Sequence, residues 1–431
     1  MGANVQADVV VVGGGIIGSA TAYYLARRGA RVVLVEKGTV GGEQSGRAWG
    51  FVRRQGRPPA AMALMVTASR MWGGLAAELG SDIEFVRDGN LAIAETPDDV
   101  ARLEAGYRDA HLAGLGSRLL TSAEVRDLIP QMQGRWKAGL YSEEDGHAEP
   151  LAVTTAFIRS AQKLGVQVWE HCTALGIDTQ ADRVCAVDTD RGRVEAGQVV
   201  AAAGVWTSLL VEPLGVTLPL RIVRSSVAAT RPAPPVTGIG VWGPILAFRQ
   251  RTTGQFYLGN GYRGAAADHD ITLASLKHLG FFLPAYLQNW RLLRVHLGRD
   301  LFADVVHRLR RDPRSRFSRG PWATARVNER SIRAAAREFH RHFPTLSRLE
   351  VERTWAGFIE LTPDLLPVLG PVARPHGLHL GVAASHGFSM GPIIGRLLAE
   401  AIVDGRPSLD LSPFRHSRFW EGPLQQTRKV L

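Results

Sequence analysis

A glycine-rich turn near the N-terminus has the residue types and spacing of a phosphate-binding site. The run Val9–Val12 predicts a buried parallel strand, and residues 19–28 continue with a helical pattern. Gly13, Gly15 and Gly18 match the pattern G-x-G-x-x-G. The first glycine permits a tight turn, the second lets backbone N–H groups approach a pyrophosphate, and the third lets helix and strand pack closely. The N-terminus of the helix then faces the phosphates.

An acidic residue follows where a ribose would lie. The second strand pattern, residues 32–35, ends at Glu36, eighteen residues after Gly18. A carboxylate at this place accepts hydrogen bonds from an adenosine ribose and repels a 2′-phosphate. Turn, helix, second strand and acid together predict a dinucleotide site. They do not distinguish FAD from NAD.

Small and polar residues follow in a predicted loop, residues 37–47, beside this turn. We expect its backbone amides and Ser45 to extend the cofactor cradle. Trp49 and Arg53 come next, and the arginine either reaches a ligand or is a surface charge. Later, a buried strand ends in Ala203-Gly204-x-Trp206, which indicates backbone close to a ligand.

A second strand-to-helix turn lies near the C-terminal end. Residues 378–382 predict a strand, and residues 383–391 predict the turn that follows it. We expect a helix from Pro392, with the proline at its first position, to end at Gly405. A helix N-terminus aimed at a ligand stabilises negative charge there.

Composition limits the class of protein. The chain has 431 residues, of which 45% are hydrophobic, so we expect a large core in two lobes. No apolar run reaches the ~18 residues of a membrane span, and residues 1–8 show no signal-peptide pattern. The two cysteines, Cys172 and Cys185, form no framework, which favours a cytoplasmic location. We expect no metal site and no membrane span.

The formal net charge is +11, and the densest basic stretch is residues 291–333. That stretch is either an anion-attracting face or a solvated helical face. No nucleic-acid-binding module accompanies it, so we expect no nucleic-acid partner. Its closely spaced arginines are Arg308, Arg310, Arg311, Arg314, Arg316 and Arg319.

Together with three further stretches, these motifs resemble the FAD-dependent amine and amino-acid oxidases. That family includes D-amino-acid oxidase, glycine oxidase, sarcosine oxidase and the B subunits of opine oxidases. The further stretches are a predicted hairpin at residues 248–259, Gly357-Phe358, and residues 362–370. The resemblance covers nearly the whole chain, and residues 45–50 look most similar to the opine-oxidase branch.

The resemblance implies an α/β fold, α+β overall. A Rossmann-like FAD-binding domain would use residues 1–85, 147–220 and 350–431. A discontinuous substrate-binding domain, built on an antiparallel sheet, would use residues 86–146 and 221–349.

The resemblance also assigns residues to the site. Arg249, Glu360 and His386 would be catalytic, and Trp49, Arg53, Arg249 and Ile359 would contact substrate. The residues assigned to non-covalent FAD are Gly13, Gly15, Ile16, Ile17, Gly18, Glu36, Lys37, Gly42, Gln44, Ser45, Gly46, Ala174, Ala203, Gly204, Trp206, His386, Gly387, Phe388, Ser389 and Met390.

Three departures from the family pattern bear on the substrate. Ile359 stands where D-amino-acid and glycine oxidases have a carboxylate-binding arginine, and Ser389 where sarcosine oxidases have a lysine. No cysteine follows Cys185, which excludes the late cysteinyl–flavin bond. Glycine, D-alanine and sarcosine are therefore expected to be poor substrates.

The resemblance implies oxidation of a C–N bond in an amine or N-substituted amino acid, by hydride transfer to the flavin. The imine product would hydrolyse, and oxygen or a carrier would accept the electrons. Partner subunits are expected from the opine-oxidase resemblance. Two alternatives remain open, namely oxidation of a C–O bond in a 2-hydroxy acid and an FAD-carrying subunit that is inactive alone.

Overall fold

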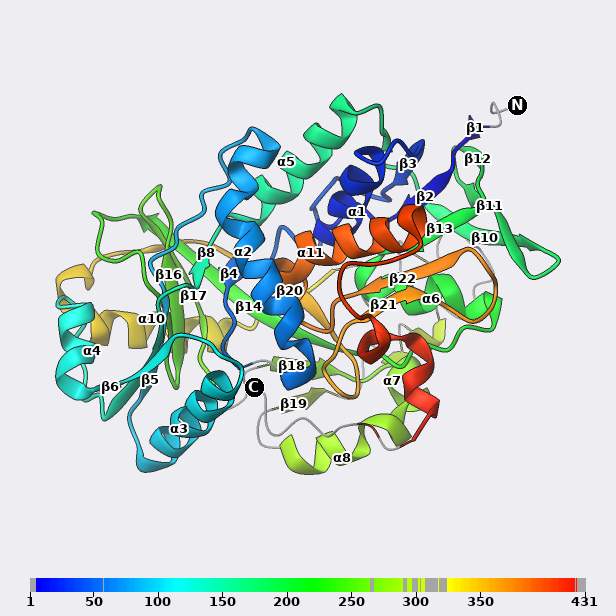
Figure 1. Cartoon of the computed structure of the whole chain (residues 1–431). Coiled ribbons are helices and arrows are strands. Elements are labelled where there is room, and N and C mark those ends of the chain that lie inside the picture. The colour runs from blue at the N-terminus through cyan, green and yellow to red at the C-terminus, as the bar shows by residue number, and fades with distance from the viewer. Residues whose placement is uncertain are drawn as a thin grey trace.

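The computed structural model describes residues 5–56, 58–263, 267–289, 293–296, 301–302, 304–306, 317, 324–422 and 424. The six closely spaced arginines of the basic stretch lie outside the described residues. Two large sheets organise the chain (Figure 1). Among the described residues, no helix combines the length and the apolar composition that crossing a bilayer requires.

The first sheet carries the phosphate-binding turn. Its six strands are parallel except at one edge, where β21 runs antiparallel to β22. In spatial order they are β21 (Val368–Pro371), β22 (Leu378–Val382), β13 (Gln198–Ala201), β2 (Val9–Val12), β3 (Val32–Val35) and β9 (Gln167–Trp169).

Alternate side chains of these strands enter two different cores. Val9 and Val11 of β2 face a core of helices, whereas Val10 and Val12 face a core on the opposite side. Successive side chains of a strand point to opposite faces of the sheet. Because both faces of this sheet are buried, all four residues of β2 are apolar. The helices of the first core are α1 (Ile16–Ala26), α2 (Met62–Leu79, after the 3₁₀ turn Pro59–Ala61), α5 (Pro150–Lys163) and α11 (Gly387–Ala399).

The opposite core lies under a smaller sheet and short helices. This sheet has the order β1-β12-β11-β10. Its strands are β1 (Val5–Gln6), β10 (Ala174–Gln180), β11 (Arg183–Thr189) and β12 (Gly192–Glu195), and α6 (Thr207–Val211) packs in the same core.

The second large sheet has ten strands and forms the other lobe. It is mostly antiparallel, but β5 pairs parallel with β15, and β18 parallel with β19. The sheet is therefore mixed rather than purely antiparallel. Its strands are β5 (Asn90–Ala94), β6 (Ser117–Thr121), β7 (Ala138–Ser142), β14 (Arg221–Pro232), β15 (Gly240–Trp242), β16 (Leu246–Gln250), β17 (Gln255–Asn260), β18 (Ala267–Asp270), β19 (Leu293–His296) and β20 (Val351–Leu361).

Helices cover both faces of this sheet. Apolar residues of α4 (Ser122–Leu128) and α10 (Glu329–His342) bury one face, and α3 (Pro97–Leu112) packs on Ala92, Ala94 and Leu140 of the other. Helices α7 (Leu273–Lys277) and α8 (Leu279–Asn289) follow β18. A two-stranded ribbon of β4 (Phe51–Val52) and β8 (Gly146–His147) completes the main elements.

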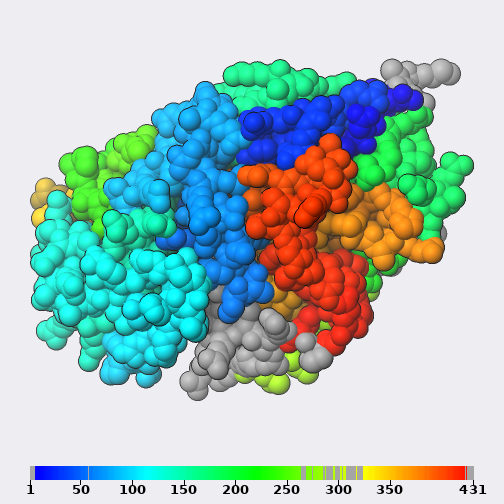
Figure 2. Space-filling view, in the orientation of Figure 1, coloured from blue at the N-terminus to red at the C-terminus, as the bar shows by residue number. Residues whose placement is uncertain are grey.

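Segments from both ends of the chain meet in the first lobe. Helix α11 packs against α1 because Gly391 and Gly395 leave no side chain between them, and an added Cβ would lie 2.5 Å from Ile16 or Ala20. Figure 2 shows the blue N-terminal segments beside the orange C-terminal helix on one face. The site is thus assembled from residues far apart in sequence.

Candidate active site

The phosphate-binding turn has the close contacts that its glycines predict. Gly13 has a φ of +110°, and a Cβ there would lie 2.4 Å from the Ala202 carbonyl oxygen. A Cβ on Gly18 would lie 1.9 Å from the Gly13 carbonyl oxygen. Gly15 is the N-cap of α1 and has no side chain. The space in front of the helix N-terminus is therefore not filled by a side chain from this position. This arrangement fits a pyrophosphate.

Glu36 stands beside this turn at the end of β3. Its Oε2 accepts a hydrogen bond from the Gly14 N–H at 2.7 Å, and its Oε1 accepts one from the Gly38 N–H at 2.7 Å. Burial raises the pKa of Glu36, while these two N–H groups oppose the rise. Each oxygen keeps a further lone pair, so the carboxylate can still accept hydrogen bonds from ribose hydroxyls.

The predicted loop interlocks with the segment after β13. The Ser45 Oγ accepts a hydrogen bond from the Ile16 N–H at 2.8 Å, and the Gln44 Oε1 accepts one from the Val205 N–H at 2.8 Å. A Cβ on Gly204 with this backbone would meet the Gln44 Oε1 at 2.0 Å. Lys37 lies 4.3 Å from the centre of the Trp206 ring. The two segments predicted to touch the cofactor are therefore in contact.

The second turn differs from the predicted one in where its helix begins. Helix α11 begins at Gly387, so Pro392 lies inside it and not at its first position. Ala384 and Ser385 have positive φ values of 48° and 74°, which stop the strand and turn the chain. Such backbone strain is typical of functional sites. The first N–H groups of α11 have no partner within the helix, as at any helix N-terminus.

One cavity of about 1030 Å³ connects these parts. It lies at the carboxyl ends of the parallel strands, next to Val12, Val35 and Gly381, where ligands bind in open α/β sheets. The predicted site residues that line it are Gly13, Gly15, Ile16, Ile17, Glu36, Lys37, Gly42, Gln44, Ser45, Trp49, Arg53, Ala174, Ala203, Gly204, Trp206, Ile359, Glu360, His386, Gly387, Phe388 and Ser389.

Four other predicted residues are placed behind this lining. Gly18, Gly46 and Met390 pack tightly without lining the cavity, and a Cβ on Gly46 would lie 2.3 Å from the Gly41 carbonyl oxygen. The fourth is Arg249, which is 1% exposed. Its guanidinium donates to the Trp49 carbonyl oxygen and, at 3.2 Å, to the Glu149 carboxylate. The geometry therefore favours Arg53 over Arg249 as a substrate contact.

Aromatic rings hold Arg53 in the cavity wall. The Trp49, Phe51 and Trp242 rings lie 5.2–6.1 Å apart. The Arg53 guanidinium stacks on Trp242 at 4.2 Å. Burial lowers the pKa of Arg53 to about 10, and the charge of Asp145 opposes this change. A half-buried cation beside a mostly apolar wall is suited to bind a carboxylate.

Glu360 is a buried carboxyl group in the same wall. It accepts a hydrogen bond from the Gln44 Nε2, and burial raises its pKa. Its neighbour Ile359 pairs with Val223 across strands β20 and β14. His386 is half-buried at the start of α11, where its ring lies 3.3 Å from the Ser385 hydroxyl. A base and a cation thus share the cavity.

The sequence analysis missed part of the far wall. Arg102, Leu103 and Arg108 of α3 line the cavity, as do Trp242 and Tyr262. The Arg102 guanidinium donates to the Tyr262 carbonyl oxygen at 3.2 Å. Arginine, leucine and aromatic residues are common in helices, strands and loops, so no local pattern marked these positions.

Comparison with protein families decides the identity of the fold. The model of the FAD dependent oxidoreductase family, DAO, matches residues 8–401. This chain belongs to that family. It is therefore an FAD-dependent oxidoreductase, and the prediction of FAD as the cofactor is confirmed at the level of the family.

Several relatives of this oxidoreductase match along almost its full length. Glycine oxidase of Bacillus subtilis is 31% identical, covering 95% of this chain and 97% of that protein. Sarcosine oxidase subunit beta of Rhodobacter capsulatus is 24% identical, covering 96% and 89%. Dimethylglycine dehydrogenase of Rattus norvegicus is 24% identical over 96% of this chain. The chain spans only 45% of that longer relative.

Solved structures confirm the predicted fold class. L-amino acid deaminase from Proteus myxofaciens, in complex with anthranilate, has a TM-score of 0.88 at 25% identity, covering 98% of this chain and 95% of that one. Glycine oxidase from Geobacillus kaustophilus has a TM-score of 0.78 at 22% identity, covering 96% and 99%. This oxidoreductase therefore shares the mixed α/β fold of these proteins.

Proposed function

We propose that this oxidoreductase oxidises a C–N bond in an amine or N-substituted amino acid. The observation that carries the proposal is the cavity of about 1030 Å³, which joins the phosphate-binding turn to Arg53 and Glu360. Relatives named as glycine oxidase and sarcosine oxidase subunit beta support the same chemistry. When bound, FAD would supply the group that accepts the hydrogen of the substrate C–H bond together with two electrons.

We assign roles to the chain's own residues in that cavity. Arg53 binds a substrate carboxylate through its guanidinium, and the Trp49, Phe51 and Trp242 rings keep water from that contact. The Glu360 carboxylate takes a proton from the substrate ammonium, leaving the neutral amine. The N-terminus of α11 provides backbone N–H groups for negative charge. Arg249 positions Trp49 by donating to its carbonyl oxygen.

The FAD is proposed to be held without a covalent bond. The two cysteines, Cys172 and Cys185, are outside the described cavity lining, and His386 is the one histidine within it. Acid precipitation of the purified protein tests this proposal. Free FAD is expected in the supernatant, and yellow colour that stays with the pellet would contradict non-covalent binding.

We propose that the domain division follows the two large sheets. Residues 1–85, 147–220 and 350–431 form the FAD-binding part, and residues 86–146 and 221–349 form the substrate-binding part. Strand β20 begins in the last FAD-binding segment yet pairs with β14 of the larger sheet, so it links the two parts. Partner subunits are proposed from the relative named as a subunit, and a cytoplasmic location from the two unpaired cysteines.

Bleaching of the bound flavin without oxygen tests the reaction. The panel contains glycine, D-alanine, sarcosine, bulkier N-substituted amino acids and matched 2-hydroxy acids. We expect the bulkier secondary amines to bleach fastest, because Ile359 replaces the arginine that anchors small amino acids in related enzymes. Bleaching by hydroxy acids alone would contradict C–N oxidation. The purified single chain is tested with a dye acceptor, which also reveals dependence on a partner subunit.

A further inference from the structure

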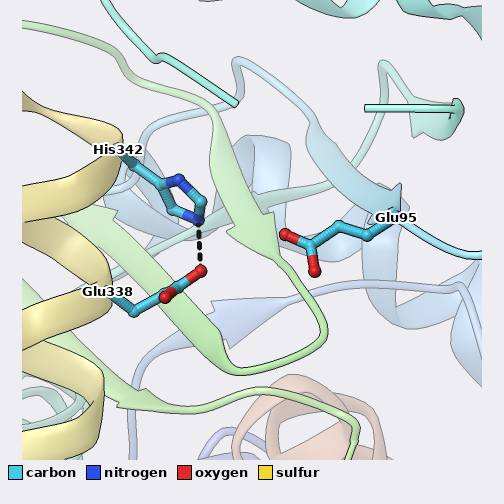
Figure 3. Close-up of side chains that lie close together, drawn as sticks. All are labelled: Glu95, Glu338 and His342. Carbon is cyan, nitrogen blue, oxygen red and sulfur yellow. Dashed lines mark ion pairs between the residues drawn. The ribbon is translucent and has the colours of Figure 1, made fainter. Parts of the chain in front are cut away.

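A second cluster of titratable side chains lies away from the cavity, between α10 and the end of β5. Glu338 and His342 are one helical turn apart on α10, and Glu95 follows β5 (Figure 3). Their three ligand atoms lie within 4.8 Å of one another. The His342 Nε2 lies 3.2 Å from the Glu338 Oε1. Figure 3 shows all three side chains pointing toward one another.

The orientation of the His342 ring shows which of its two nitrogens faces the carboxylates. The His342 Nδ1 lies 3.0 Å from the Gln133 carbonyl oxygen, and a carbonyl can only accept. Nδ1 therefore carries a proton, and in the neutral ring the lone pair is on Nε2. That lone pair is directed at a carboxylate oxygen, which also carries lone pairs. The His342 side chain is 3% exposed, so water does not separate the two groups as it would at a surface.

Two facing lone pairs repel each other, and a cation shared between His342 and Glu338, either a proton or a metal ion, removes that repulsion. A backbone carbonyl that fixes one ring nitrogen, leaving the other for the metal, is the usual arrangement around a metal-binding histidine. Atoms 3.2 Å apart can share an ion about 2.0–2.2 Å from each.

We propose that Glu95, Glu338 and His342 bind a divalent first-row cation such as Zn²⁺. One nitrogen and two carboxylate ligands suit this ion, and water completes its coordination. A small cavity beside the cluster, lined by Glu95, Gln133, Gly134, Arg135 and Arg341, gives the ion a path. The bound ion joins α10 to the sheet that carries the substrate wall.

Two arginines compete with the ion for the carboxylates of the cluster, and this competition leads to a specific expectation for their replacement. Arg341 contacts Glu338 and, at 3.4 Å, Glu95, and Arg263 lies 3.8 Å from Glu95. The Arg341 side chain is 62% exposed, so it can turn into solvent when the ion enters. Replacing Arg341 should consequently strengthen binding, whereas replacing a ligand should weaken it.

Titration of Zn²⁺ into the FAD-loaded protein after chelator treatment tests the site. We expect one ion per chain, at least tenfold weaker binding in Glu338→Gln and Glu95→Gln, and tighter binding in Arg341→Gln. Glu350→Gln is the matched control, because this glutamate is 71% exposed and, within the described part of the chain, forms an ion pair only with exposed Arg231. Its affinity should equal that of the wild type.

Thermal unfolding with and without Zn²⁺ gives a second readout. The ion should raise the melting temperature of the wild type and of Glu350→Gln, but not that of Glu338→Gln. Glu95→Gln lies on a different element, so it tests the site even if Glu338→Gln disturbs α10. Absence of binding by the folded wild type, or equal affinity in both ligand variants and the wild type, would overturn the proposal. The shared cation would then be a proton.

Discussion

Arg249 is buried and Arg53 is half-buried near the substrate wall, and their different surroundings separate their roles. Arg249 is paired with Glu149 and with a backbone carbonyl oxygen, so its charge is used within the protein. Arg53 stacks on Trp242 and lines the cavity. Because Arg53 lines the cavity and Arg249 does not, Arg53 is better placed to contact a substrate carboxylate.

Replacing Arg53 should therefore weaken recognition of a carboxylate. We expect Arg53→Ala to reduce kcat/KM by roughly 10- to 150-fold, which corresponds to about 1.5–3 kcal/mol for a charge-assisted hydrogen bond. The corresponding ester substrate should lose much less. Arg118→Ala, at a residue of β6 that is not among the lining residues, is the control. An equal loss with acid and ester would assign Arg53 a structural role.

Replacing Arg249 should affect stability more than recognition. Arg249→Ala leaves the Trp49 carbonyl oxygen without its donor and removes one partner of the largely buried Glu149. We expect a loss of about 1–3 kcal/mol in the free energy of unfolding, measured by denaturant titration. Glu149 keeps its ion pair with Arg251 at 3.0 Å, which limits the loss. Unchanged stability with a large rise in KM would contradict this positioning role.

Glu360 should make both activity and stability depend on pH. Burial raises the pKa of Glu360, so between its unfolded and folded pKa values the folded state binds more protons. Stability therefore falls as pH rises through that window. Glu360→Gln should melt at a higher temperature than the wild type at pH 8, and this gain should vanish below the ordinary carboxyl pKa. The variant should also lose the acid limb of the kcat/KM profile. Retention of that limb would assign the proton transfer to another group.

At the scale of elements, the crossing of α1 and α11 places both helix N-termini at one cavity. The crossing depends on glycines, because a Cβ on Gly395 would lie 2.5 Å from the Ala20 Cβ and 2.6 Å from backbone atoms of Ala20 and Thr21. Backbone cannot move aside as a flexible side chain can. The separation of the two helices therefore controls the geometry around the cofactor.

The substitution Gly395→Ala tests this contact. We expect a loss of about 1–3 kcal/mol in the free energy of unfolding and a lower FAD content, because overpacking pushes α1 away from α11. Gly74→Ala is the matched control on the exposed face of α2, where an added Cβ meets nothing within 4 Å. The control should gain about 0.4–1 kcal/mol. Equal effects of the two substitutions in denaturant titration would contradict the role of the crossing.

At the scale of the whole molecule, two sheets contribute to one cavity. Val12 and Val35 of the parallel sheet line it together with Ala92, Leu140 and Trp242 of the larger sheet. A ligand in this cavity contacts both lobes at once. Occupation should therefore stabilise the folded chain as a unit.

Added FAD should raise the stability of the cofactor-free protein. At an FAD concentration about 100 times Kd, the increase is expected to be about 2.7 kcal/mol, since FAD binds the folded state alone. Thermal unfolding at several FAD concentrations measures this increase. A Gly15→Leu variant is the control, because its side chain fills the pyrophosphate space and should abolish the shift. A melting temperature independent of FAD in the wild type would contradict the assignment of the turn.

The sequence by itself determined the features that are local. The glycine turn, Glu36, the loop 37–47 and the Ala203-Gly204-x-Trp206 segment could be predicted because each depends on neighbouring residues and on strand or helix periodicity. The fold class was implied by the family resemblance that these motifs carry, and comparison with known structures confirms it. The placement of each residue around FAD stays a prediction.

Only the tertiary structure decided which distant side chains meet. Arg249 and Arg53 are both arginines near aromatic residues, and only three-dimensional packing shows that Glu149 and Trp49 engage the first of them. Glu338 and His342 show only a spacing of four in the sequence, until the fold brings Glu95 to them from 243 residues away. The physical reason is that burial and pairing depend on contacts between elements, which no local pattern encodes.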